Sequence, residues 1–124
     1  MEPVTRAHAD EPAPSATDIS DRYSEYAKAA HSTASRCRSK GDSYGEQLAS
    51  TRAKVYEEAA SIAASMPAQR AAEEMMRRAA SEHVRTPPLI GFDEAGLRYI
   101  TARAWQFCAL EIDPRLQTRA PKWD

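Results

Sequence analysis

The 124-residue chain is short of large aliphatic side chains. Leu, Ile, Val and Phe together number only 15, whereas alanine alone numbers 24. So low a share of large apolar residues is typical of disorder when the net charge is also high, but here the net charge is −1. Alanine has the highest helix propensity of all residues. The composition therefore predicts a folded, helical protein with a thin core.

Glycine, cysteine, asparagine and long apolar runs are also scarce or absent. The four glycines form no GxGxxG or GxxxxGK[ST] loop, which argues against a nucleotide-binding fold. Cys37 and Cys108 form neither a CxxC motif nor a disulfide framework. No segment has the apolar length of a signal peptide or a membrane span. We therefore expect a cytoplasmic protein with reduced thiols. The lack of Asn, with 13 Arg against four Lys, indicates GC-rich coding and so a bacterial or phage origin.

Apolar spacing, together with residues that start and stop helices, predicts four helices. They run over about 17–38, 43–66, 68–84 and 94–111. Gly41 is a good stop for the first helix, and Ser43 with Glu46 has capping-box spacing at the start of the second. Asp93 is the expected cap of the fourth. Pro67 either separates the second and third helices or kinks one long helix.

The predicted fold is an all-α bundle of three or four helices. Residues 1–16 form a disordered Pro/Ala-rich tail, residues 17–113 the bundle, and residues 114–124 a C-terminal tail. The second helix has a heptad seam of Leu48, Val55 and Ile62, which is expected to pack on the first. Its expected partners on the first helix are Ile19, Tyr23 and Tyr26. The fourth helix is expected to close the core through Leu97, Ile100, Ala104 and Phe107.

No catalytic or cofactor-binding motif stands out, so we expect a non-enzymatic protein without metal or cofactor. Two acidic pairs, Glu57-Glu58 and Glu73-Glu74, fall on neighbouring helices and could in principle converge on a metal ion. No histidine has the spacing of a partner ligand for them. The favoured interpretation is an acidic face paired with the nearby cations Lys54, Arg77 and Arg78.

These observations favour a protein–protein interaction protein, such as an adaptor, an assembly subunit or an inhibitor. The chain has several helical stripes and no motif for chemistry, and aromatic residues are common anchors at interfaces. The predicted partner contacts are Tyr23, Tyr26, Trp105 and Trp123. Because one chain buries little apolar surface, self-association into a homo-oligomer is also expected.

The alternative is a small regulator that binds nucleic acid through basic clusters. Residues 27–40 carry four bases and no acid, and two adjacent arginines follow later in the chain. Such clusters can contact phosphate, although cations at helix C-termini also serve the helix dipole. The candidate residues for this function are Arg36, Arg38, Lys40, Arg77 and Arg78.

Overall fold

The computed structural model describes residues 16–85 and 92–120, and this part of the chain is built of helices without a strand. The prediction of a small all-α bundle is confirmed. The elements are α2 (Ala16–Ser39), α3 (Ser43–Ser65), α4 (Ala68–Arg85), α5 (Phe92–Ile112) and the 3₁₀-helix η1 (Pro114–Arg119). The predicted disordered tail over residues 1–16 falls almost entirely outside the described residues. None of the described helices is long and apolar enough to cross a membrane.

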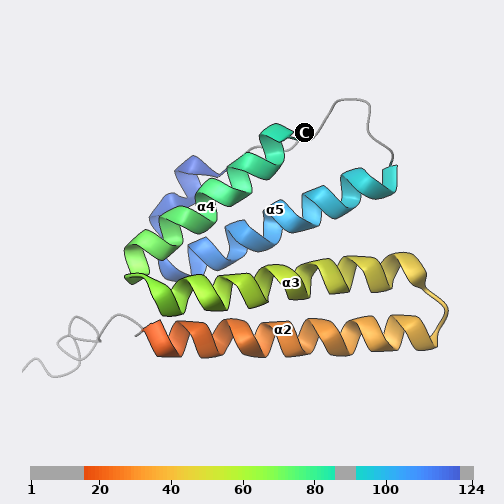
Figure 1. Ribbon diagram of the computed structural model, residues 1–124. Coiled ribbons are helices and arrows are strands. Elements are labelled where there is room, and N and C mark those ends of the chain that lie inside the picture. The colour runs from red at the N-terminus through yellow and green to blue at the C-terminus, as the bar shows by residue number, and fades with distance from the viewer. Residues whose placement is uncertain (1–15, 86–91, 121–124) are drawn as a thin grey trace, which may run out of the picture.

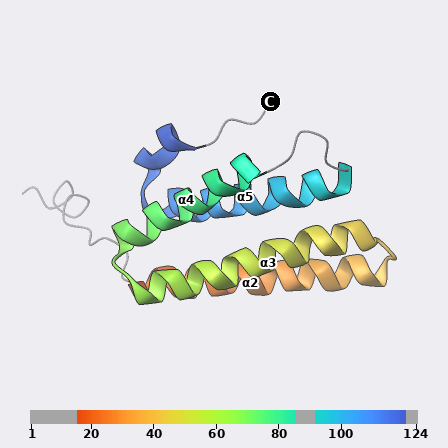
Figure 2. The same ribbon diagram turned by 45° about the horizontal axis from the view of Figure 1, so that its top comes forward.

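The helices form two antiparallel hairpins that pack on each other. In Figure 1, α2 and α3 lie side by side along their full length, and α4 and α5 form the second pair above them. Figure 2 shows the two pairs as separate layers. Helix α5 makes the main contact between the layers, because it packs on α3 as well as on α4. One side of α5 is therefore buried between the two layers.

A glycine turn joins α2 to α3. Gly41 has a φ of 76°, in the left-handed region that favours glycine. The amide of Asp42 donates to the Cys37 carbonyl at 2.8 Å, and that of Gly41 donates to the Arg38 carbonyl at 3.1 Å. These two bonds are a Schellman motif, which satisfies carbonyls left free at a helix end. Gly41 thus stops the helix as predicted.

The cap of α3 differs from the prediction by one residue. Asp42, not Ser43, is the N-cap, and its carboxylate accepts from the Gly45 amide at 2.8 Å. Glu46 does not reach back to the chain as in a capping box. It forms an ion pair with Arg38 across the turn instead. Asp and Ser are equally good caps, and the non-helical backbone of the cap falls on Asp42, with φ −90° and ψ 84°, because the Gly41 turn ends there.

Helices α3 and α4 are two helices and not one kinked helix. Met66, after the last residue of α3, has φ −148° and ψ 161°, an extended conformation. The following Pro67 accepts from the Ala71 amide at 2.9 Å, so it stands at the start of α4. Proline is well placed there because it has no amide to leave unsatisfied. The chain therefore reverses sharply between the two layers.

Most of the buried residues of α2 and α3 are alanines. On α2 the buried apolar residues after Tyr23 are all alanines, and on α3 alanines stand on both sides of Val55. These buried alanines are Ala27, Ala30 and Ala34 of α2 and Ala49, Ala53, Ala59, Ala60 and Ala63 of α3. The residues predicted to pack together, Ile19 and Tyr23 of α2 and Val55 and Ile62 of α3, belong to one core cluster. Leu48 is only half-buried.

The prediction that Phe107 closes the core is wrong. Ala104 is buried as expected, but its buried companions on α5 include Trp105, Cys108 and Ala109, and Phe107 is 45% exposed. Helix α5 carries apolar residues on every side, so its pattern does not fix which side faces inward. The helix also begins at Phe92, so the predicted cap Asp93 lies inside it.

The chain continues to pack beyond residue 113. Asp113 caps η1 by accepting from the Arg115 amide at 3.1 Å, and its carboxylate also accepts from Gln69 of α4 at 2.8 Å. The guanidinium of Arg115 and these hydrogen bonds hold the pKa of Asp113 well below its usual range. Leu116 is buried in the core. The first part of the expected C-terminal tail is thus an ordered helical turn.

Candidate functional site

Tyr23 ties α2 to α5 and is not a partner contact as predicted. The side chain is 0% exposed, and its hydroxyl donates to the Cys108 carbonyl at 2.5 Å. Burial raises the pKa of Tyr23 far above its usual range, so the hydroxyl stays protonated. The ring is buried and the hydroxyl is bonded within the chain, so neither is accessible to a partner.

Trp105 is likewise buried, at 4% exposed, so the structure corrects its assignment as a partner contact. The guanidinium of Arg78 lies over the Trp105 ring, 5.0 Å from its centre, which is the geometry of a cation–π contact. Trp123, the fourth predicted contact, lies outside the described residues. Of the four predicted contacts, Tyr26 is the one found partly at the surface.

Three aromatic rings from three helices meet beside α5. The ring centre of Tyr26 of α2 is 5.5 Å from that of Tyr56 of α3 and 5.6 Å from that of Phe107 of α5. The Tyr26 hydroxyl donates to the Glu111 carboxylate at 2.6 Å. Partial burial and this bond raise the pKa of Tyr26 to about 12. The cluster holds Phe107 in place with its outer side open to solvent.

The outer side of α5 carries exposed apolar side chains. Tyr99 and Phe107, at 40% and 45%, are the exposed large apolar side chains there. They stand eight residues apart with Arg103 midway, so all three project from one side of the helix. The Arg103 guanidinium lies over the Tyr99 ring at 5.9 Å. We call this surface, with Tyr26 and Tyr56, the Phe107 face.

Phe107 stands between two shallow hollows. One, of about 210 Å³, lies between α2 and α3 and is lined by Tyr26, Arg52 and Tyr56 as well as Phe107 of α5. The other, of about 310 Å³, runs along α5 to η1, and besides Phe107 it is lined by Arg103, Gln106, Leu110, Glu111 and Gln117. A partner that rests on the Phe107 ring and places side chains in the two hollows is held at one position along α5.

One polar group beside this ridge has no partner. Gln106 is 5% exposed, and its Oε1 atom forms no hydrogen bond within the described residues. A buried acceptor without a donor costs roughly 1–3 kcal/mol. An unsatisfied polar group in the wall of a surface hollow is unexpected for a side chain that serves only the fold.

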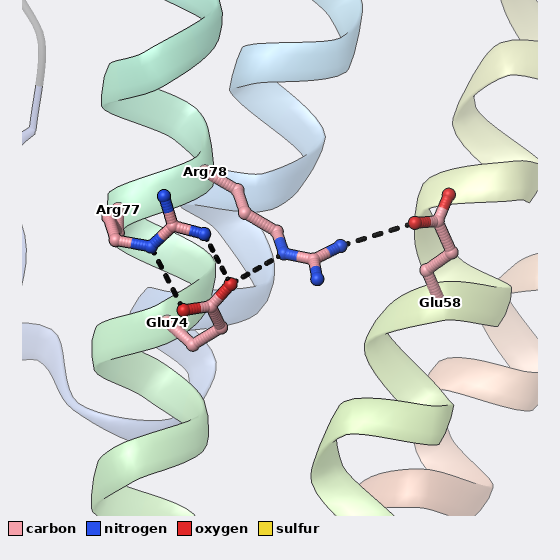
Figure 3. Close-up of polar contacts among 4 residues, drawn as sticks. All are labelled: Glu58, Glu74, Arg77 and Arg78. Carbon is pink, nitrogen blue, oxygen red and sulfur yellow. Dashed lines mark hydrogen bonds and ion pairs between the residues drawn. The ribbon is translucent and has the colours of Figure 1, made fainter.

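A second polar cluster joins α4 to α3, and it contains two of the predicted nucleic-acid contacts. Figure 3 shows that Glu74 forms ion pairs with Arg77 and Arg78 of the same helix, and that Arg78 also forms an ion pair with Glu58 of α3. The Arg77 and Arg78 hydrogen bonds lower the pKa of Glu74 to about 2. The expected pairing with these arginines is therefore present for Glu58 and Glu74. Glu57 lies 3.0 Å from His31 instead, and Glu73 accepts from Gln69.

The basic residues predicted to bind phosphate do not form one surface. Arg77 and Arg78 are neutralised by the carboxylates of Figure 3, and Arg38 pairs with Glu46. Arg36 and Lys40 stay exposed near the α2–α3 turn. The pairs of Glu74 with Arg77 and Arg78 lie three and four residues apart on α4, as sequence spacing allows. The Arg78–Glu58 pair joins two helices and the Arg38–Glu46 pair spans the α2–α3 turn, so spacing within one helix does not reveal them.

The described residues hold no cluster of His, Cys, Asp or Glu that could bind a metal ion. Burial raises the pKa of the Cys108 thiol far above its usual range, which leaves it a weak nucleophile. Sequence reasoning missed Phe107, Tyr56 and Arg52 as surface residues. The signal for Phe107 was the number of apolar residues in α5. A helix that is apolar on all sides exposes some apolar side chains unless other elements enclose it completely.

Comparison with known proteins gave no relative: no family model, curated protein or solved structure matches this chain.

Proposed function

We propose that this chain is a non-enzymatic interaction protein of the cytoplasm that binds another protein through the Phe107 face. The observation that carries the proposal is the placement of Tyr99 and Phe107 on the outer side of α5. The chain has few large apolar residues, and two of them lie at the surface on the same side of one helix. Apolar surface gathered in this way marks interaction sites on proteins.

The contacts around Phe107 also fit a docking surface. The rings of Tyr26 and Tyr56 hold Phe107 from below, so a partner would meet an anchor that is already ordered. Binding to an ordered side chain loses less conformational entropy than binding to a mobile one. Interface energies are concentrated in such aromatic anchors near the centre of the contact.

Photo-crosslinking from a single position tests this proposal. A benzoyl-phenylalanine residue replaces Phe107 in one variant and Glu73, an exposed residue of α4, in the control. Both variants are expressed in the native cell and irradiated. We expect position 107 to capture a defined protein that position 73 does not. Equal capture from both positions, or none from position 107, would overturn the assignment of this face.

Nucleic-acid binding is the second candidate, and one observation favours it. Arg52 and Arg103 stand beside exposed aromatic rings, and arginines mixed with aromatics bind single strands. This function predicts binding to a single-stranded RNA probe that weakens steeply as salt rises. A salt-insensitive signal, or none, removes it.

A further inference from the structure

We propose that the partner of the Phe107 face is an acidic amphipathic helix. Its apolar side chains rest on Phe107 and Tyr99, and its carboxylates pair with Arg103 and Arg52. This inference rests on the proposed function and specifies the chemistry of the partner.

The charge of the face is the first argument. Six arginines of the described segments have a carboxylate within ion-pair distance: Arg22, Arg38, Arg77, Arg78, Arg98 and Arg115. Arg52 and Arg103 have no carboxylate within ion-pair distance among the described residues. The one acid that lines either hollow, Glu111, is already bonded to Tyr26 and Arg22. The face therefore carries two arginines, Arg52 and Arg103, with no ion-pair partner among the described residues, and the acid that lines one of its hollows is bonded elsewhere.

The spacing of these groups is the second argument. Arg103 lies one turn from Tyr99 and one turn from Phe107 along α5. Arg52 reaches the other side of Phe107 from α3, where it lines the hollow shared with Tyr26. A helix laid along α5 presents side chains at the same one-turn interval, so it can set an apolar residue on each ring and an acid on Arg103.

Gln106 adds a polar contact. The residue lines the hollow next to Phe107, and its buried Oε1 has no partner within the described part of the chain. A donor from the bound helix satisfies this acceptor after a small rotation of the amide. The group that is costly in the free chain thus gains its hydrogen bond in the complex.

Two other occupants fit the face less well. A second copy related by a twofold axis would bring Arg52 and Arg103 against the same surface, where like charges repel. For single-stranded RNA, the rings of Tyr26 and Tyr56 are packed against neighbours at tilts of 41–69°, which leaves few open ring faces for bases to stack on.

Selection from a displayed library of random peptides of about 15 residues, long enough for a helix, tests the inference. The full chain is the bait, and Phe107→Ala is used for counter-selection. We expect the enriched peptides to be acidic, with apolar residues at three- and four-residue intervals. Enrichment of neutral or basic peptides, or of none, overturns the acidic helix.

Charge reversal provides the matched control. Arg52→Glu with Arg103→Glu should weaken binding of a selected peptide at least roughly tenfold at low salt, and less at high salt. Arg70→Glu with Arg119→Glu changes the net charge equally at two exposed arginines outside the two hollows and should leave binding unchanged. Equal weakening by both pairs would show that only overall charge matters and would refute the proposed contacts.

Gln106→Met separates a binding role from a structural one. Removing the unsatisfied amide should raise the thermal midpoint and weaken the selected peptide at the same time. A variant that is more stable and binds equally well removes Gln106 from the site.

The outcomes also distinguish this inference from the proposed function. Specific crosslinking at position 107 combined with selection of non-acidic peptides retains the face and rejects the partner chemistry. Failure of both rejects both. Sedimentation velocity tests the second copy as the occupant, and a dimer that is lost on Phe107→Ala would overturn the acidic helix. A single-stranded RNA probe tests the other occupant, and salt-sensitive binding of that probe would overturn the acidic helix as well.

Discussion

Enlarging one buried alanine between α2 and α3 should destabilise the protein. Ala53 is 0% exposed, and the buried apolar residues that follow Tyr23 on α2 are also alanines. A Leu at position 53 adds three carbon atoms, which would contribute about 2 kcal/mol if the interface had room for them. We expect no such room, because helices that meet through alanine approach closely.

Overpacking of this kind costs roughly 1–3 kcal/mol, so Ala53→Leu should lower the free energy of unfolding by that amount. For a domain of this size the thermal midpoint should fall by about 4–8 °C for each kcal/mol. The control is Ala64→Leu, at an exposed position of the same helix, where we expect little change. Urea unfolding and thermal melts followed by circular dichroism measure both variants.

The result that would refute this reasoning is an unchanged or raised midpoint for Ala53→Leu. It would mean that the α2–α3 contact has slack, and that the buried alanines do not set the distance between the two helices.

Three further changes have expected outcomes. Gly41→Ala forces a side chain into the left-handed region at φ 76°, so the free energy of unfolding in urea should fall by about 1–2 kcal/mol, whereas an unchanged value would show that the turn relaxes freely. Glu74 has a pKa of about 2 in the folded chain against an ordinary 4.5, so its stabilisation is complete above pH 4.5 and is lost as pH falls toward 2. Glu74→Gln should therefore remove about 1 kcal/mol at neutral pH and flatten the acid limb of the stability curve, and an acid limb as steep as that of the parent chain contradicts this. Tyr23→Phe deletes the buried hydrogen bond to the Cys108 carbonyl and should cost about 1 kcal/mol by the same urea assay, and a loss well below that value would make this bond unimportant for stability.

The ends of the helices were predictable because single residues determine them. Gly41 stops α2 through its left-handed conformation, and Pro67 can only begin a helix or break one. The cap of α3 was misplaced by one residue because Asp42 and Ser43 have equivalent capping chemistry. Only the position of the preceding turn decides between them.

The candidate site was less predictable, because it depends on how helices are rotated against each other. The aromatic residues Tyr23 and Tyr26 are three positions apart on α2, yet one is fully buried and the other meets Phe107 at the surface. Helix α5 is apolar on every side, so its sequence fits several rotations equally well. The pairing of Arg78 with Glu58 also depends on the packing of α4 on α3.

The alanine contact between α2 and α3 has a consequence for how stability varies with temperature. A buried alanine loses no rotamer freedom on folding, whereas a buried leucine loses roughly 0.5–1 kcal/mol. Folding of this thin core therefore costs little side-chain entropy, although it also buries little apolar area. Because the heat capacity of unfolding scales with the apolar area exposed, that heat capacity should be small for a chain of this length, and the stability curve should be broad and shallow.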